Sequence, residues 1–311
     1  MIPFGPVPSR RLGKSLGVNN IPPKICTYSC VYCQIGRTKN FGFERKSFYP
    51  LKKIEVEIEE TLKKLRDKKE HIDYLSFVPD GEPTLDINLG KEIERLKNFG
   101  IKIAVITNAS LIWMESVRED LAKADWVSVK VDAVSEDVWK KIDRPYKKLS
   151  LKEILEGIEK FSSMFKKTLV TETMLINGIN DTEEELEKIA RFLKKLNPKF
   201  AYIGIPTRPP AEERIKPPSE EKINTAYQIF VEKYSLKTEL LTGYGGTSFG
   251  FTGDIKEDIL NITSVHPMRE EQVNELLKKA NKDWSVLEEL VKEGKIKELK
   301  YQEKKYYLRK L

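Results

Sequence analysis

Short apolar stretches alternate with longer amphipathic stretches between residues 15 and 240, and this alternation constrains the fold more than any other feature of the chain. The apolar stretches are mostly continuous, which is typical of strands buried on both faces of a parallel sheet. Six βα units in series predict an α/β protein with helices outside a parallel sheet, either a barrel or an open doubly wound sheet. The predicted strands are 15–21, 72–78, 101–107, 126–131, 168–176 and 200–205.

Amphipathic patterns predict the helices that connect these strands. The longest patterns cover residues 51–70, 86–100, 149–165 and 182–196. Asn180 and Asp181 precede the last of these helices as candidate caps.

A glycine-dense stretch near residue 241, LTGYGGTSFGFTGD, ends the alternation. Residues 264–311 then read as a separate unit, with helices at 268–280 and 284–294 and a terminal hairpin. This order is the outline of a winged-helix-like domain, although a small packing module without a ligand has the same outline. We therefore predict one domain over residues 1–250 and a smaller one over residues 264–311.

The composition indicates a soluble, cytoplasmic protein. Of the 311 residues, 40% are hydrophobic and 33% are charged, and no apolar run approaches the roughly 20 residues of a membrane span. The first residues lack the apolar core of a signal peptide. Three cysteines without a secretion signal argue against a disulfide framework.

Basic residues gather at both ends of the chain. Residues 1–48 hold eight lysines and arginines against one acid, and residues 295–311 hold seven against two. A basic rim of this kind suits an anionic substrate or RNA. A surface rich in lysine and glutamate is also how a thermophile protein maintains ion pairs, so the net charge of +7 does not by itself select a ligand.

All three cysteines, Cys26, Cys30 and Cys33, lie within one short segment, KICTYSCVYCQIG. Three soft thiolates at one point suit zinc or an iron–sulfur cluster. Structural zinc takes four ligands, and neither His71 nor His266 is near in sequence, while a disulfide would leave one thiol over. The spacing favours a cubane cluster with one open iron that can bind a small chelating molecule.

The CxxxCxxC spacing, with Tyr32 before the last cysteine and a predicted strand before the first, resembles the signature of the radical S-adenosylmethionine (SAM) superfamily. The resemblance extends over residues 1 to about 250. It implies a partial (β/α)6 barrel, a [4Fe–4S] cluster on Cys26, Cys30 and Cys33, and SAM chelated at the open iron. One electron from an external donor would then cleave SAM to methionine and a 5′-deoxyadenosyl radical.

Two further segments resemble this family at the ends of predicted strands. Gly81 and Glu82 resemble part of its Gly-Gly-Glu-Pro element, which holds the SAM ammonium group, and Asp80 replaces the first glycine. Thr107 and Asn108 stand where the family has a Thr-Asn pair. Without the resemblance, the first segment is a strand-to-helix turn and Asn108 an ordinary helix cap.

The stretch WVSVKVDAV places three polar side chains, Ser128, Lys130 and Asp132, on one face of a predicted buried strand. By the resemblance, Ser128 or Asp132 meets the ribose hydroxyls and Lys130 meets the SAM carboxylate. An ion pair between Lys130 and Asp132 inside the barrel is the alternative. The segment TETMLINGIND resembles the one whose backbone contacts the adenine, so Ile176 is a candidate contact, and Glu172 faces the same side.

Within the superfamily, the segments FGPVPSRRLGKSLGVN, SFVPDGEPTLD and TMLINGIND are most similar to a group of Fe–S oxidoreductases of archaea and thermophilic bacteria. That group is related to the wyosine-forming enzymes of tRNA and, more distantly, to glycyl-radical-enzyme activases. Archaeal wyosine synthases carry extra cysteines for a second cluster, and this chain has none. We therefore expect a single cluster.

Three functions remain open on the sequence. The first is radical SAM chemistry on an RNA such as a tRNA, and the second is radical modification of a protein or peptide, such as glycyl radical activation. The third is a non-catalytic iron–sulfur or zinc module that binds RNA.

Candidate substrate residues come from the basic and aromatic side chains. Arg10, Arg11, Arg144 and Arg208 are candidates for phosphate contacts, and Tyr244 in the glycine-rich loop is a candidate for quenching a radical or supporting the site. The tail interleaves tyrosines with lysines, at Tyr301, Tyr306 and Tyr307. These tyrosines suit stacking on single-stranded RNA, or equally a hairpin packed on the barrel.

Overall fold

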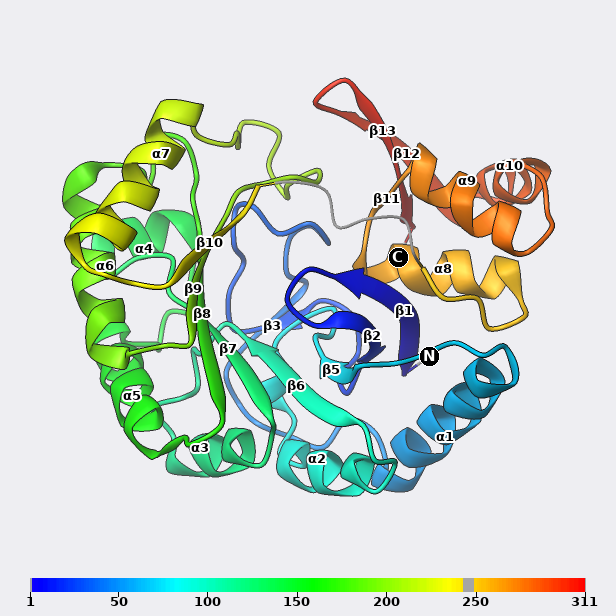
Figure 1. Ribbon diagram of the computed structural model, residues 1–311, viewed down its shortest axis with the longest axis horizontal. Helices are drawn as coiled ribbons and strands as arrows, with labels where there is room; N and C mark the ends of the chain where they lie inside the picture. The colour runs from blue at the N-terminus through cyan, green and yellow to red at the C-terminus, as the bar shows by residue number, and fades with distance from the viewer. Residues whose placement is uncertain (1, 243–248, 311) are drawn as a thin grey trace.

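The computed structural model describes residues 2–242 and 249–310 and contains one main sheet of eight strands. The strand order is β1-β2-β5-β6-β7-β8-β9-β10, with β1 antiparallel to β2 and every other neighbouring pair parallel. The sheet curls into a half-barrel with helices outside (Figure 1). Its strands are β1 (Pro3–Ser9), β2 (Gly13–Val18), β5 (Tyr74–Phe77), β6 (Lys102–Thr107), β7 (Trp126–Lys130), β8 (Thr168–Met174), β9 (Phe200–Gly204) and β10 (Thr238–Leu241).

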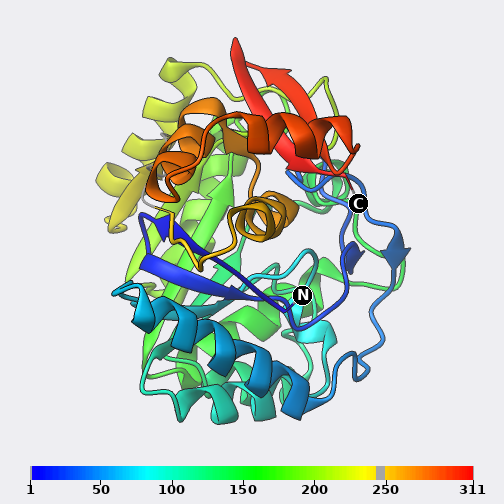
Figure 2. The same cartoon turned by 90° about the vertical axis from the view of Figure 1, so that its right-hand side faces the viewer.

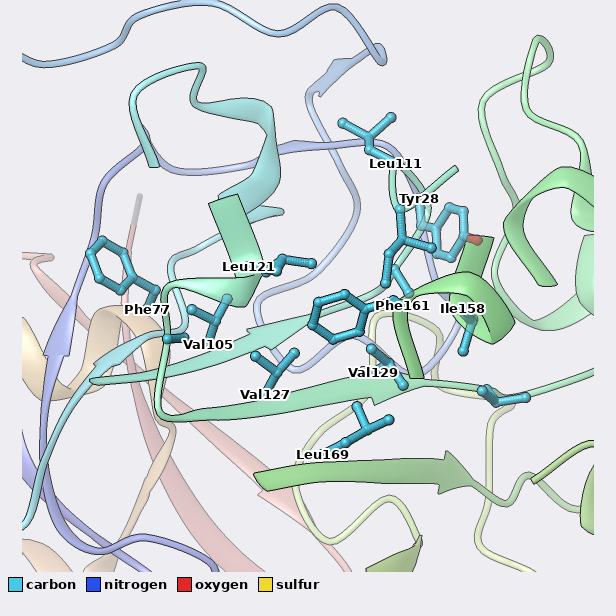
Figure 3. Packing of buried hydrophobic residues seen from close by; sticks show 14 of the residues in the cluster. Tyr28, Phe77, Val105, Leu111, Leu121, Val127, Val129, Ile158, Phe161 and Leu169 are labelled. Atoms are coloured by element: carbon cyan, nitrogen blue, oxygen red, sulfur yellow. The ribbon is translucent and has the colours of Figure 1, made fainter. Parts of the chain in front are cut away.

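Helices cover the outer face of the half-barrel and bury their apolar side chains against it. Figure 3 shows Phe161 of α5 over Val127 and Val129 of β7, within the largest apolar cluster. The predicted helices between the strands are confirmed. The outer elements are α1 (Leu51–Asp67), α2 (Leu89–Lys97), α3 (Glu115–Ala122), α4 (Glu136–Ile142), α5 (Leu151–Met164), α6 (Glu183–Leu196) and α7 (Glu220–Gln228).

The six predicted strands are present, but the sequence did not reveal β1 and β10. Strand β1 contains three prolines, at Pro3, Pro6 and Pro8, which disfavour a strand except at a sheet edge. It lies at one edge, and β10, only four residues long, lies at the other. The sequence also did not reveal helices α3, α4 and α7, which are seven to nine residues long.

An apolar cluster fills the barrel interior near the amino ends of the parallel strands. It consists of a small buried cluster of Leu12, Ala104, Trp126, Val170 and Tyr202. Trp126 is the first residue of β7, so this cluster lies toward the amino ends of the parallel strands. The space above it, at the carboxyl ends, is where barrels of this kind build their sites.

The C-terminal part forms a second packing unit around its own apolar cluster. Its sheet has the order β11-β13-β12, and residues 302 and 303 have φ angles of 47° and 60°, so both adopt the left-handed conformation of a tight hairpin turn. The predicted helices and hairpin are confirmed. The elements are α8 (Ile255–Val265), β11 (Met268–Arg269), α9 (Glu270–Lys279), α10 (Ser285–Lys292), β12 (Ile296–Tyr301) and β13 (Lys304–Arg309).

Helix α8 packs with this C-terminal unit, although the predicted boundary at residue 264 leaves it out. Its buried Ile255, Ile259 and Ile262 belong to the same cluster as α9 and α10. The sequence interpretation stopped at the glycine-dense loop and did not recognise the helix that follows. We propose that the second unit starts at α8, and its description as a winged-helix-like domain stays a prediction.

The C-terminal unit lies against the open edge of the half-barrel, with α8 beside β1 (Figures 1 and 2). Its hairpin reaches the loop after β9, where Tyr301 Oη donates to the Pro206 carbonyl at 3.1 Å and Tyr306 Oη to the Thr207 carbonyl at 2.8 Å. Tyr307 is buried against Trp284. These contacts favour packing over RNA stacking for the three tyrosines. No helix in the described residues has the length and apolar character needed to span a membrane.

Candidate functional site

A cavity of about 430 Å³ lies at the carboxyl ends of the parallel strands, and all three cysteines line it. The segment that carries them includes two short paired strands, β3 (Ile25–Cys26) and β4 (Asn40–Phe41). This segment lies within the curve of the half-barrel (Figure 1). The cysteine loop and the strand ends therefore share one site, as the order of motifs in the sequence predicts.

Backbone hydrogen bonds hold the cysteine loop in a compact shape. The Cys33 amide donates to the Cys30 carbonyl at 3.1 Å, and the Gly36 amide donates to the Cys33 carbonyl at 3.0 Å. The end of α4 anchors the loop from outside, because the Val31 amide donates to the Ile142 carbonyl at 2.9 Å.

The three thiols are neutral in a metal-free pocket of this kind. Burial raises the pKa of Cys26 to about 12, and the nearby Glu82 carboxylate adds to the rise. Burial, followed by Asp143, raises the pKa of Cys30 well above its ordinary value. Burial also raises the pKa of Cys33, while Lys24 opposes the rise. Thiolate ligation therefore requires a positively charged group that displaces the protons.

The donor set fits an iron–sulfur cluster better than a single metal ion. Among the described residues, no three His, Cys, Asp or Glu side chains converge as ligands of one ion. The thiols nevertheless line one cavity. Three thiolates that bind different irons of a cubane need not meet at one point, so Cys26, Cys30 and Cys33 could hold such a cluster.

The loop after β5 packs tightly on the start of the cysteine loop. The Glu82 amide donates to the Ile25 carbonyl at 3.1 Å, and the Lys24 amide donates to the Asp80 carbonyl at 2.7 Å. A Cβ atom at Gly81 would lie 1.8 Å from the Ile25 carbonyl oxygen. Only glycine permits this approach, which explains the residue type in the predicted SAM-binding segment.

The Glu82 carboxylate is largely engaged inside the protein. Its Oε1 accepts from the Thr84 amide at 3.1 Å, the Thr84 hydroxyl at 2.6 Å and the Thr107 hydroxyl at 2.5 Å. Its Oε2 accepts from the Asn108 amide at 2.8 Å. Oε1 has no lone pair left, so a bound ammonium group could use only Oε2 or nearby carbonyls.

Asn108 connects the end of β6 to the cysteine loop. Its Nδ2 donates to the Thr27 hydroxyl at 2.9 Å and lies 3.6 Å from Cys26 Sγ. Its Oδ1 accepts from the Ser110 amide at 2.9 Å. Asn108 thus forms a local turn and positions the first cysteine; it is not a helix cap, since α3 begins only at Glu115, and its SAM contact stays a prediction.

A network of buried charged side chains lies at the cavity. Lys130 pairs with Glu172 at 3.2 Å and with Asp132 at 4.0 Å, and Arg11 pairs with the other Glu172 oxygen. The Lys130 ammonium also lies 4.8 Å from the centre of the Tyr32 ring. Burial acts to raise the pKa of Glu172, but the charges of Arg11 and Lys130 outweigh it and lower this pKa to about 2.

Of the three polar residues predicted on β7, Lys130 alone lines this cavity. Ser128 is fully buried, and its hydroxyl has no hydrogen-bond partner. Asp132 accepts from the Tyr32 hydroxyl and, at 2.7 Å, from the Met174 amide. The alternative of a Lys130–Asp132 ion pair is therefore present, and ribose contacts by Ser128 or Asp132 stay predictions.

Ile176 lies outside the cavity lining, and its backbone groups are engaged. Its amide donates to Asn180 Oδ1 at 2.8 Å, and its carbonyl accepts from the Ile179 amide at 3.1 Å. Strand β8 ends at Met174, which does line the cavity, so the alternation that placed Ile176 inward stops before that residue. The helix that follows is capped by Thr182, and Asn180 organises this loop instead.

The family model for the Radical SAM superfamily matches residues 20–193, more than half of the chain. The chain belongs to the radical SAM superfamily. It is 52% identical over 309 residues to the UPF0026 protein MJ1312 of Methanocaldococcus jannaschii, which covers 99% of this chain and 96% of that protein. The cofactors of this radical SAM enzyme are accordingly a [4Fe–4S] cluster and SAM.

More distant similarities agree with this assignment. A probable dual-specificity RNA methyltransferase RlmN of Endomicrobium trichonymphae is 28% identical over 209 residues, which cover 64% of this chain and 57% of that protein. The crystal structure of a radical SAM methyltransferase from Sphaerobacter thermophilus matches with a TM-score of 0.57 and 17% identity, over 73% of this chain and 66% of that chain. The second match shows the shared fold, and the predicted partial radical SAM barrel is confirmed.

The radical SAM cavity brings together some of the predicted substrate residues and not others. Arg10, Arg11 and Arg208 line it. Arg144 does not, and it pairs instead with Glu212, so its assignment to the substrate site loses its basis. Tyr244 lies outside the described residues.

Two residues of the radical SAM site escaped the sequence interpretation. Asp143 accepts from Cys30 Sγ at 3.3 Å and lies 3.5 Å from the Tyr32 hydroxyl. It stands beside Arg144, which drew attention only through its charge. His266 lines the cavity from the end of α8, more than 230 residues beyond the cysteines, and no local pattern connects the two.

Proposed function

We propose that this radical SAM enzyme holds a single [4Fe–4S] cluster on Cys26, Cys30 and Cys33 and acts on an RNA, such as a tRNA. The cluster and SAM together supply a 5′-deoxyadenosyl radical. The chain's own residues fix the loop, orient SAM and shape the substrate space. The supporting observation for one cluster is that the three thiols of the chain all line one cavity.

We infer from the polar groups of the cavity which end binds SAM. Gly81 brings the backbone after β5 close to the cysteine loop, and the carbonyls of this turn together with Glu82 Oε2 are the candidate partners of the ammonium group. Lys130 offers a cation to a carboxylate, because Asp132 and Glu172 overcome the effect of burial and raise its pKa. Tyr32 and Asp132 hold this lysine in place.

The observation that carries the RNA proposal is the charge of the cavity rim. Arg10 and Arg208 line the same cavity as the thiols, Arg11 does so while paired with Glu172, and the tail of the chain adds further lysines. Such a distribution favours a polyanionic substrate over a neutral peptide. The similarity to a probable RNA methyltransferase supports the same class of substrate.

The first test is the release of 5′-deoxyadenosine from SAM by the anaerobically reconstituted, reduced protein. We expect Cys30→Ala to abolish both the cluster absorbance and the release, because a thiolate ligand is lost. Ser29→Ala, next to it in the same loop, is the matched control and should retain both. A Cys30→Ala protein that still cleaves SAM contradicts the ligand assignment.

The second test concerns the substrate. The loaded enzyme should bind bulk tRNA with an affinity that falls steeply with salt. Recovery of the enzyme with a polypeptide that becomes modified, and without nucleic acid, would instead support the protein-modifying alternative.

A further inference from the structure

Arg208 is a partly buried arginine for which the described residues supply no carboxylate partner. It lies in the loop after β9 and lines the radical SAM cavity. Its Nη1 donates to Gln34 Oε1 at 2.8 Å, and its Nη2 donates to His266 Nε2 at 3.1 Å. No carboxylate of the described residues forms an ion pair with it, whereas Arg11 in the same cavity is paired with Glu172. A charge that is partly withdrawn from water without a counter-charge is costly, and it points to an anion supplied from outside.

The groups around Arg208 are neutral or positive. Burial lowers the pKa of Arg208 to about 10. Tyr306 acts to raise this pKa, while the charges of Arg269 and Arg11 lower it further. Burial and the Arg208 charge also hold the pKa of His266 well below its ordinary value, so this ring is neutral. Because a guanidinium only donates, His266 Nε2 accepts and the ring proton is on Nδ1.

The C-terminal unit holds this arginine in place. The carbonyls of the two preceding residues, Pro206 and Thr207, accept hydrogen bonds from the β12–β13 hairpin. His266 at the end of α8 holds the guanidinium from the same unit. A guanidinium fixed in advance loses little side-chain entropy when it binds an anion.

We propose that Arg208, supported by Gln34 and His266, forms an anion subsite that binds a backbone phosphate of the RNA substrate. This inference rests on the proposed function and adds the contact that places the RNA. Of the five N–H donors of the guanidinium, two are used by Gln34 and His266, and a planar fork suits two phosphate oxygens. Gln34 directly follows Cys33, so the bound phosphate lies beside the cluster loop.

The main test uses the full-length, cluster-loaded enzyme and the Arg208→Gln variant. Bulk tRNA should bind the variant about tenfold more weakly or worse, because charge-assisted hydrogen bonds are lost. Inorganic phosphate should compete with tRNA in the wild type and much less in the variant. SAM affinity and the substrate-free release of 5′-deoxyadenosine, measured on the same preparations, should fall much less than tRNA affinity. Arg191→Gln, an exposed arginine on α6, is the matched control.

Several outcomes overturn the subsite. Unchanged tRNA affinity in Arg208→Gln does so, and so does an equal loss of SAM affinity, which would assign the guanidinium to the SAM carboxylate. A wild type that releases no 5′-deoxyadenosine at all would refute the proposed function instead. The competition between phosphate and tRNA tests the subsite alone, because it does not depend on SAM cleavage.

A second measurement needs no variant and covers the case in which Arg208→Gln does not fold. Phenylglyoxal modifies accessible arginines, and inorganic phosphate should slow its reaction with Arg208 in the wild-type enzyme severalfold, read by peptide mass spectrometry. Arg191 should react at the same rate with and without phosphate. Equal protection of both arginines, or of neither, contradicts the subsite, because a purely structural clamp has no reason to respond to phosphate.

Discussion

Asp80 replaces a glycine of the family pattern, and the replacement places a carboxyl group in a buried environment. The side chain is buried, lines the cavity, and its Oδ1 has no hydrogen-bond partner. Burial raises the pKa of Asp80 to about 7, although the nearby Lys24 charge opposes the rise. The carboxyl group is therefore half-protonated near neutral pH in the protein without SAM.

We expect Asp80→Asn to stabilise the SAM-free protein at alkaline pH. Between about pH 4 and pH 7 the folded state holds a proton on Asp80 that the unfolded state has released, so this residue's contribution to stability falls as the pH rises. The advantage of Asp80→Asn over the wild type should grow through this window, by roughly 4 kcal/mol at most, and then level off. Denaturant unfolding at pH 5 and pH 8 measures it. Asp67→Asn, an exposed acid on α1, should show no such growth.

Gly81 belongs to the same turn and is constrained by space alone. We expect Gly81→Ala to lower the free energy of unfolding by roughly 1–3 kcal/mol and to reduce the iron content after reconstitution, because the added Cβ displaces the cysteine loop at Ile25. Gly42→Ala is the matched control in the following segment, since its Cβ meets nothing within 4 Å. Equal iron content in both variants would show that the contact does not position the loop.

At the level of elements, the β12–β13 hairpin holds the loop after β9 against the barrel. Tyr306 makes the central contact, since its hydroxyl donates to the Thr207 carbonyl and accepts from Arg269 Nε at 2.9 Å. The hairpin of the C-terminal unit thereby controls a loop that lines the cavity. A loop and a hairpin about 100 residues apart in sequence act as one wall.

Tyr306→Phe should loosen this wall without emptying the core, because the ring is retained and two hydrogen bonds are lost. We expect a loss of about 1–3 kcal/mol in unfolding free energy and faster amide exchange in residues 205–209. Hydrogen exchange read by mass spectrometry tests this. Tyr227→Phe, a more exposed tyrosine on α7, should change neither quantity.

For the molecule as a whole, the packing of α8 beside β1 brings two basic regions together. The N-terminal hairpin carries Arg10 and Arg11, and the C-terminal hairpin carries exposed lysines. Figure 2 shows the C-terminal unit above the N-terminal strands on the same side of the molecule. By the proposed function, a long polyanion contacts both regions.

Replacing Lys297 and Lys304 by Gln should weaken tRNA binding and flatten its salt dependence. Each lost phosphate contact lowers the slope of log affinity against log salt by about 0.7–0.9, so the double variant should lose between one and two units. Fluorescence anisotropy over a salt series measures the slope. Lys63→Gln with Lys160→Gln, exposed positions on α1 and α5, should leave it unchanged, and equal slopes in both pairs would contradict the proposed RNA surface.

Local patterns were sufficient to predict the six central parallel strands, the main connecting helices and the cysteine loop. Apolar periodicity and ligand spacing depend only on residues that are close together in the sequence. They were also enough to identify the superfamily. The edge strands escaped prediction because edges tolerate proline and polar residues that central strands exclude.

Only the tertiary structure decided which polar side chains face the cavity and which satisfy one another. Lys130 lines it and Asp132 does not, although both alternate along one stretch, because Tyr32 and the Met174 amide engage the Asp132 carboxylate. Arg208 meets His266 through the docking of two units far apart in the chain. Such contacts depend on packing between distant segments, which no local pattern encodes.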